Sequence, residues 1–197
     1  GALGVIWGRN GHEVMFSSRN PTKLKALIKS IENANIGFPA DAAKFGDIVV
    51  LAVPWLQAEN AIKSAGPLNG KILIDCTNPL KPDYSGLEVG FTTSAAEEVA
   101  RLTPGAKVVK AFHTTFAALM QSESRMFGGI KPTGFYCGND SASKAVVSNL
   151  IQETGLEPID AGPLENARYL EPLAMLMINL GFAQKMGNNI AIKLLRR

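Results

Sequence analysis

The stretch that decides the fold is DIVVLAVPWLQAENAIKSAGPLNGKILIDCTNP, residues 47–79. It begins with a continuous apolar run at 47–53 and contains a second one at 71–76. Continuous rather than alternating runs of this length are typical of strands buried on both faces of a parallel sheet. The segment between the runs has a helical pattern that ends at Gly66. The stretch therefore predicts two parallel strands joined by a helix that packs on the sheet.

The same alternation of helix and strand continues on both sides of this unit. A third apolar run lies at 106–112, after a helical pattern with Ser94 as its cap. Earlier in the chain, apolar residues recur at helical spacing from Leu24 to Ile31. The sequence therefore predicts an α/β fold of the Rossmann type, with a doubly wound and mostly parallel sheet.

The second half of the chain adds two further strands. Runs at 134–140 and 155–162 are typical of strands, and they flank a helix whose cap is Asp140 or Ser141. We expect these strands to extend the sheet.

The chain is expected to divide into two parts. Residues 1–112 would form a dinucleotide-binding core, and residues 113–197 a C-terminal part. Within the second part, 133–161 extends the sheet and 163–197 is a small helical region. Its methionine-rich apolar residues are typical of a core or a dimer interface rather than a cofactor site. We expect a homodimer, although helices buried within one subunit would give the same pattern.

The beginning of the chain departs from this alternation. GALGVIWGRNG, residues 1–11, has the pattern of a helix that closes at Gly11, and the strand HEVMF follows. In a dinucleotide-binding fold, a strand and a G-x-G-x-x-G turn precede this helix, with the third glycine at the helix start. We expect Gly1 to be that glycine, and the first strand and the rest of the glycine loop to be missing from the N-terminus. The alternative is a chain that begins with the helix and lacks the central strand.

The segment HEVMFSSRNPTK, residues 12–23, places hydroxyl groups and cations where this fold meets the adenosine ribose. Asn20 is a favourable helix cap before Pro21, so Ser18, Arg19 and Lys23 converge on a helix start. An acidic residue at this position binds a ribose 2′-hydroxyl, whereas an arginine accommodates a 2′-phosphate. The segment therefore predicts a preference for NADPH over NADH. A solvated surface turn is the alternative.

Three strands end in polar or proline-containing turns at the carboxyl edge of the predicted sheet, where open α/β folds bind ligands. The first two turns are AVPW at 52–55 and CTNP at 76–79. Proline ends a central strand, because it cannot donate to the ladder. The third strand runs into AFHTT and brings His113 to the same edge.

Composition excludes several other classes of protein. The formal charge is +3 and the lysines are scattered without basic runs, which argues against nucleic acid as a partner. There are two histidines and two cysteines, and the metal-binding patterns CxxC and HExxH are absent, so no metal site is expected. The longest apolar stretch, 173–183, is shorter than a membrane span. Cysteines in strand-like runs and the lack of a secretion signal favour the cytoplasm.

Several of these segments together resemble the NADPH-dependent oxidoreductases of coenzyme F420, an 8-hydroxy-5-deazaflavin. The resemblance covers nearly the whole chain and is carried by GHEVMFSSRNPTK, DIVVLAVPW, VVKAFHT, CGNDSASKAVVSNLI and, most specifically, PIDAGPLENARYLEPL. KILIDCTNP and VVKAF also resemble the reductase domain of the STEAP metalloreductases.

The resemblance implies a role for each candidate residue. Ser18, Arg19 and Lys23 would hold the 2′-phosphate, and Gly1 would be the remnant of the pyrophosphate loop. Two turns would line the dinucleotide up to the nicotinamide, and their residues are Ala52, Val53, Pro54, Thr77, Asn78 and Pro79. His113 would lie beside the acceptor ring, although a histidine at a strand end is also commonly structural.

The expected activity is hydride transfer between NADP(H) and a small redox acceptor, either coenzyme F420 or a flavin-like ring. The reactive groups would belong to the two cofactors, and the protein would align them and exclude water. The loops at 80–93 and 121–132 are long enough to act as lids over the acceptor. Two alternatives stay open at this stage: an imine or keto-acid reductase, and a non-enzymatic module that senses NADP(H).

Overall fold

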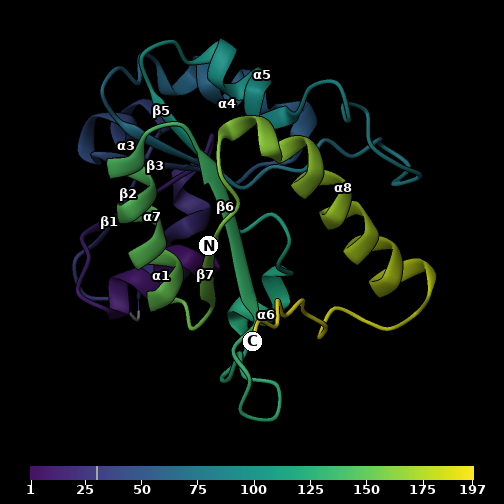
Figure 1. Cartoon of the computed structure of the whole chain (residues 1–197). Coiled ribbons are helices and arrows are strands. Elements are labelled where there is room, and N and C mark those ends of the chain that lie inside the picture. The colour runs from purple at the N-terminus through teal and green to yellow at the C-terminus, as the bar shows by residue number, and fades with distance from the viewer. Residues whose placement is uncertain (30) are drawn as a thin grey trace.

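A computed structural model describes residues 1–29 and 31–197 (Figure 1). Helices and strands alternate along most of the chain. In chain order, the elements are α1 (Ala2–Arg9), β1 (Val14–Ser17), the 3₁₀ turn η1 (Pro21–Leu24), α2 (Lys25–Ile28), β2 (Ala34–Gly37), α3 (Pro39–Phe45), β3 (Ile48–Leu51), the 3₁₀ turn η2 (Trp55–Gln57), α4 (Ala58–Ala65), β4 (Ile72–Asp75), α5 (Ala95–Leu102), β5 (Lys107–Ala111), α6 (Ala117–Gln121), β6 (Thr133–Gly138), α7 (Ser141–Glu153), β7 (Glu157–Asp160), the 3₁₀ turn η3 (Leu164–Asn166), α8 (Ala167–Ile178) and the π-helix η4 (Asn179–Ala183).

The strands form two sheets. β1 and β2 pair in parallel, from Val14 opposite Ala34 to Ser17 opposite Gly37. The other five strands follow the order β3-β4-β5-β6-β7, in which β3, β4 and β5 are parallel and β6 runs antiparallel to β5. β7 is parallel to β6, so the strands predicted at 134–140 and 155–162 do extend the sheet. This arrangement confirms the mostly parallel α/β fold.

Helices cover both faces of the larger sheet, because successive residues of a strand point to opposite faces. Leu73 of β4 and Val108 of β5 belong to a core shared with α3, α4, α5 and α8. The next residues along, Ile74 and Val109, belong to a second core with α1, α6 and α7. Figure 1 shows α8 on the opposite side of β6 from α1 and α7. The chain is therefore doubly wound.

Within the described residues, no strand pairing joins the two sheets. In the strand order of a doubly wound fold, the strand that leads into α1 lies between β1 and β3. The expectation that this strand and the glycine loop are missing before Gly1 stays a prediction. The division of the chain at residue 112 also stays a prediction, and the five-stranded sheet contains strands from both sides of it.

The helix expected over 163–197 is wrong beyond Ala183. Lys185 and Gly187 adopt positive φ angles of 59° and 79°, which no helix accommodates. The chain then passes beside the start of β6, where the Thr133 amide donates to the Ile192 carbonyl at 2.8 Å. Figure 1 shows this C-terminal segment reaching the lower end of β6. The Leu194 amide also donates to the Thr133 hydroxyl, at 3.0 Å, so Thr133 anchors this segment at two points.

Candidate active site

The turns after β3, β4 and β5 meet at the carboxyl edge of the sheet. The Cys76 amide donates to the Leu51 carbonyl at 3.0 Å, which joins the turn after β4 to the end of β3. The Asn78 side chain donates from Nδ2 to the His113 carbonyl at 2.9 Å, which joins the same turn to the end of β5. The structure therefore brings together the predicted residues 52–54, 77–79 and His113.

A cavity of about 150 Å³ opens at this edge, between the ends of β4 and β5 and helix α8. Polar groups lie on the strand side and apolar side chains on the helix side. The lining residues are Asn78, His113, Thr114, Thr115, Phe116, Ala117, Ala174, Met177 and Ile178. The methionine-rich helix was predicted only as core or dimer interface. It also supplies one wall of this cavity.

Unpaired polar atoms cluster beside the cavity. Among the described residues, five buried side-chain nitrogen or oxygen atoms have no hydrogen-bond partner, and four of them belong to Thr77, Asn78 and His113. These four are Thr77 Oγ1, Asn78 Oδ1 and both ring nitrogens of His113. A buried polar atom without a partner costs free energy, and such atoms in a native fold call for an explanation. Their gathering at one edge indicates a place for a polar ligand.

His113 is held as a neutral imidazole. Burial lowers its pKa well below the ordinary value of 6.5, and the nearby charge of Lys110 acts in the same direction, whereas the backbone groups of Leu170 and Ala111 beside the ring act weakly in the opposite one. The preceding residue, Phe112, adopts a φ of 64° although it is not glycine. Its ring packs edge-on against Trp7, with 5.7 Å between the ring centroids. Backbone strain of this kind persists only where the surroundings impose it, and it is concentrated at functional sites.

A buried charge network, which the sequence patterns did not predict, lies directly behind the cavity. Lys110, Asp75 and Glu171 form two ion pairs of 2.9 Å, and their side chains have no exposed surface. Two of them have a signal in the sequence, because Asp75 and Lys110 interrupt the apolar runs at 71–76 and 106–112. A charged residue in such a run has to find a partner. Glu171, in α8, had no comparable signal.

The predicted phosphate site lies at the end of the two-stranded sheet. The Ser18 amide donates to the Gly37 carbonyl of β2 at 3.3 Å, and the Ser18 hydroxyl accepts from the Asn20 amide at 3.1 Å. The side chains of Arg19 and Lys23 are exposed, and neither forms an ion pair within residues 1–29 and 31–197. No hydrogen bond within these residues joins this group to His113.

Asn20 is the residue that precedes the helical turn, with Pro21 at its start, as predicted, but the Asn20 side chain makes no capping hydrogen bond to the backbone. Its side-chain oxygen accepts from the Thr22 hydroxyl instead, and the turn that follows is the short 3₁₀ element η1 rather than the start of a long helix. Gly1 lies just before α1, and its carbonyl accepts from the Val5 amide at 3.1 Å. The ligand-binding roles predicted for Gly1, Ser18, Arg19 and Lys23 stay predictions.

Within the described part of the chain, no three histidine, cysteine, aspartate or glutamate side chains are grouped as metal ligands would be. Within the same residues, no helix combines the length and apolar character needed to cross a bilayer.

Comparisons with known proteins point to one family. The family described as "NADP oxidoreductase coenzyme F420-dependent" matches residues 1–79. The F420-dependent NADP reductase of Methanocaldococcus jannaschii is 33% identical over 172 residues, covering 83% of this chain and 76% of that protein. The crystal structure of a protein from Arthrobacter sp. FB24, described as an F420-dependent NADP-reductase, has a TM-score of 0.87 and 32% identity. It covers 99% of this chain and 94% of that one.

A second relative is longer than this chain. The metalloreductase STEAP3 of Rattus norvegicus is 30% identical over 169 residues, covering 86% of this chain but only 33% of that protein. The chain thus spans about a third of the length of STEAP3, whereas it spans 76% of the M. jannaschii reductase. Since identity of at least 30% over most of both chains links it to the reductases, this chain belongs to the family of F420-dependent NADP oxidoreductases.

Proposed function

We propose that this chain transfers hydride between NADP(H) and a deazaflavin such as coenzyme F420, or a related flavin-like ring. One observation carries the proposal: three buried and unpaired polar atoms belong to Asn78 and His113, which line the strand side of a cavity whose helix side is apolar, and a fourth belongs to Thr77, the residue before Asn78. A planar ring system with polar edges matches this division, because its faces pack on apolar side chains while its edges pair with fixed polar groups.

The residues at the two ends of the proposed cofactor site fit NADP(H). Thr77 Oγ1 and Asn78 Oδ1 are buried without partners, so the polar groups of a bound dinucleotide would satisfy them. Arg19 and Lys23 are exposed cations at the end of β1, and an arginine at this position accommodates a 2′-phosphate. Ser18 would add a hydroxyl. Residues 52–54 would line the dinucleotide between these two ends.

The chemistry of the step belongs to the bound cofactors: when NADPH is bound, its nicotinamide supplies a hydride. The protein's own contribution is alignment and exclusion of water. Phe116, Met177 and Ile178 give the cavity an apolar wall. His113, neutral because burial lowers its pKa, presents one N–H donor and one acceptor nitrogen. It can therefore orient the polar edge of the acceptor ring without a change of charge.

The alternative of imine or keto-acid reduction requires a proton donor in the site. His113 is the titratable side chain that lines the cavity, and its lowered pKa makes its protonated form scarce at neutral pH. The geometry therefore favours an acceptor that takes up hydride without an acid from the protein. A module that only senses NADP(H) has the same binding residues, and turnover separates it from a reductase.

The test measures NADPH oxidation by the full-length protein with four acceptors in parallel: coenzyme F420, FMN, a ferric chelate and pyrroline carboxylate. We expect turnover with coenzyme F420 or FMN. We also expect His113→Asn to lower kcat while the affinity for NADPH is retained, because His113 faces the acceptor. Tight binding of NADPH without turnover would favour the sensing module, and turnover with pyrroline carboxylate alone would favour the imine reductase. Unchanged kcat in His113→Asn would remove this residue from the site.

A homodimer stays a prediction. Several apolar side chains at the end of the chain are exposed, and Leu176, Phe182 and Met186 each have more than half of their surface accessible. Such surfaces are often interfaces. The mass of the protein in solution, measured by light scattering, tests this prediction.

A further inference from the structure

The ammonium group of Lys110 is the centre of the buried charge network. Its Nζ donates to Asp75 Oδ2 at 2.9 Å and to the Thr77 carbonyl at 2.6 Å, and it lies 2.9 Å from Glu171 Oε1. An ammonium has three donors and no acceptor. All three donors of Lys110 are therefore used, each on a different segment: β4, the turn after β4, and α8.

The two carboxylates carry the connection further. Asp75 Oδ1 accepts from the Thr77 amide at 2.9 Å. Glu171 accepts from the amides of Ala95 and Ala96, at 2.9 and 3.1 Å, at the start of α5. Burial raises the pKa of Glu171, but both of its oxygens face donors, so the ionised form is the one that fits. The helix start also favours a negative charge there.

Stability alone does not account for this network. Buried ion pairs lose most of their Coulombic gain to desolvation, and well-packed apolar residues of the same volume often stabilise a fold equally well. The network does fix the positions of the segments that carry it, since all three side chains are fully buried and both carboxylates pair with Lys110.

The network joins the three walls of the cavity. In the turn after β4, the residue that follows Thr77 is Asn78, which donates to the His113 carbonyl. Beyond the end of β5, His113 follows Lys110 by three residues. On α8, Ala174 follows Glu171 by nearly one turn, and Met177 by nearly two. Each wall is therefore attached to the same ammonium group.

We propose that Lys110 is a positioning residue for the acceptor cavity: it holds the turn after β4, the end of β5 and helix α8 at the separation that aligns the two ring systems. The proposal rests on the proposed function, because it assigns the network to the same cavity. It predicts that the network affects the chemical step and not folding alone.

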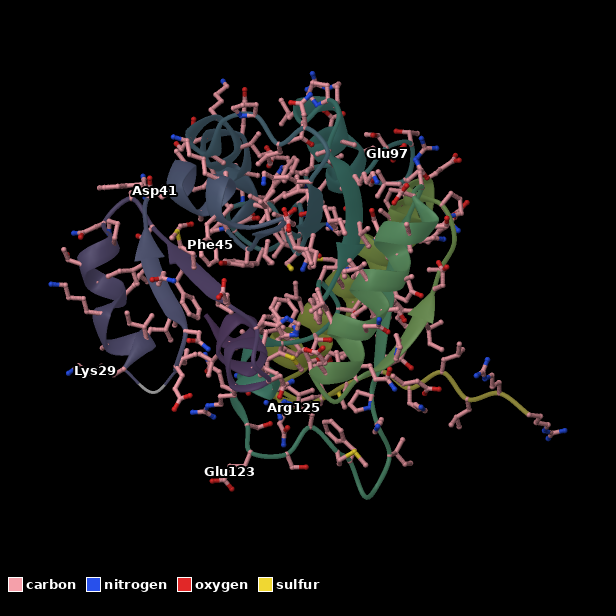
Figure 2. All side chains as sticks on the ribbon, turned by 90° about the vertical axis from the view of Figure 1, so that its left-hand side faces the viewer. Lys29, Asp41, Phe45, Glu97, Glu123 and Arg125 are labelled. Carbon is pink, nitrogen blue, oxygen red and sulfur yellow. The ribbon has the colours of Figure 1, made fainter. Side chains whose placement is uncertain are left out.

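A second ion pair provides a matched control. Arg168 of α8 binds Glu97 of α5 through Nε and Nη2, at 2.9 and 2.7 Å. It links the same two helices as Glu171 does, but neither of its residues touches β4 or β5 through an ion pair or a side-chain hydrogen bond within the described residues. Glu97, labelled in Figure 2, lies in the first turn of α5. Arg168→Met therefore loosens α8 from α5 without disturbing the strand ends.

The experiment compares the full-length protein with the triple variant Asp75→Asn/Lys110→Met/Glu171→Gln and with Arg168→Met. The triple variant removes all three charges and nearly preserves volume, but methionine leaves the Thr77 carbonyl without its donor, so its Tm is expected to fall and kcat is measured well below the Tm of both proteins. Its kcat is expected to fall at least about tenfold, since small misplacements of reacting groups are costly. Amide exchange at 113–117 should become faster. Arg168→Met should change neither kcat nor this exchange.

Three outcomes overturn the proposal: a folded triple variant with unchanged kcat and exchange, Arg168→Met with the same losses as the triple variant, or an effect on Tm alone. If the triple variant does not fold, Glu171→Gln replaces it, because this change keeps the side-chain size. Unchanged kcat and exchange in Glu171→Gln would then overturn the proposal. If the unmodified protein reduces no acceptor, the proposed function fails, whereas amide exchange at 113–117 still tests whether Lys110 positions this segment.

Discussion

Replacing Arg19 by alanine tests the electron donor assigned to this chain. Arg19 follows β1 and is exposed, and it makes no ion pair within residues 1–29 and 31–197. Its loss should therefore leave the fold intact. Surface substitutions away from special features change stability by about 0.5 kcal/mol or less, which corresponds to a shift in Tm of roughly 2 °C or less in a chain of this size. Any large effect must then come from ligand binding.

The size of the binding effect follows from the type of contact. A hydrogen bond to a charged group contributes about 1.5–3 kcal/mol, and 1.4 kcal/mol corresponds to a tenfold change in affinity. Arg19→Ala should therefore weaken NADPH binding by about 10- to 150-fold. NADH has no 2′-phosphate, so its affinity should change less than about twofold. The ratio of the two affinities is the quantity of interest, because it cancels any general loss of binding.

The assay is isothermal titration calorimetry of each variant with NADPH and with NADH. Lys29→Ala is the matched control, since Lys29 is also an exposed cation of the β1–β2 unit. Figure 2 shows Lys29 and Asp41 at opposite ends of this unit. Asp41 lies in α3, which follows β2, and Ser18 bonds to the end of β2 at Gly37, so Lys29 lies at the far end from Arg19. Equal losses of NADPH and NADH affinity in Arg19→Ala would refute the assignment, as would an equal selectivity change in Lys29→Ala.

Two further predictions concern folding stability. Gly134→Ala should cost about 1–3 kcal/mol, because a methyl group there would lie 2.6 Å from Cγ2 of the buried Ile151. Thermal unfolding measures this, and Gly86→Ala, whose methyl group meets nothing within 4 Å, should leave Tm unchanged. His113 has a lowered pKa in the folded state, so the unfolded chain binds the proton more tightly. The contribution of His113 to the free energy of unfolding is therefore fully present above the unfolded-state pKa of about 6.5. It decreases as pH falls below that value and is lost once pH has fallen through the folded-state pKa. His113→Asn should therefore flatten the decline of Tm below about pH 6.5, and an unaltered decline would contradict the lowered pKa.

The sheet was predictable because its strands carry their own signal. The runs at 47–53, 71–76 and 106–112 are mainly apolar and do not alternate with polar residues, as is typical of strands covered on both faces, and each contains a strand in the structure. β2 was missed, since its four residues, ANIG, include one β-branched side chain and a glycine. The C-terminal segment was assigned to a helix because Ile190 and Leu194 are spaced like one. Its conformation depends instead on hydrogen bonds with Thr133, which no local pattern can reveal.

The candidate site was predictable on the strand side alone. Strand order places the ends of β3, β4 and β5 at one edge, and the hydrogen bond between Asn78 and His113 joins two of the predicted positions there. The helix side depends on how α8 crosses the sheet. That crossing brings Met177 and Ile178 into the cavity wall. It also brings Glu171 to Lys110. Helical periodicity identifies an apolar face but does not say which strand it meets.

Several departures from the ordinary rules of folding gather at the carboxyl edge of β4 and β5. Lys110 and Asp75 place charges in buried strands, Phe112 adopts a left-handed backbone conformation, and four polar atoms stay unpaired. Each feature costs stability, and none is needed to form the sheet, because apolar residues and a regular backbone would suffice. Energetically costly features that gather in one place are typical of ligand-binding sites. They support the proposal that the carboxyl edge of β4 and β5 binds the reacting groups, and they do so independently of the family resemblance.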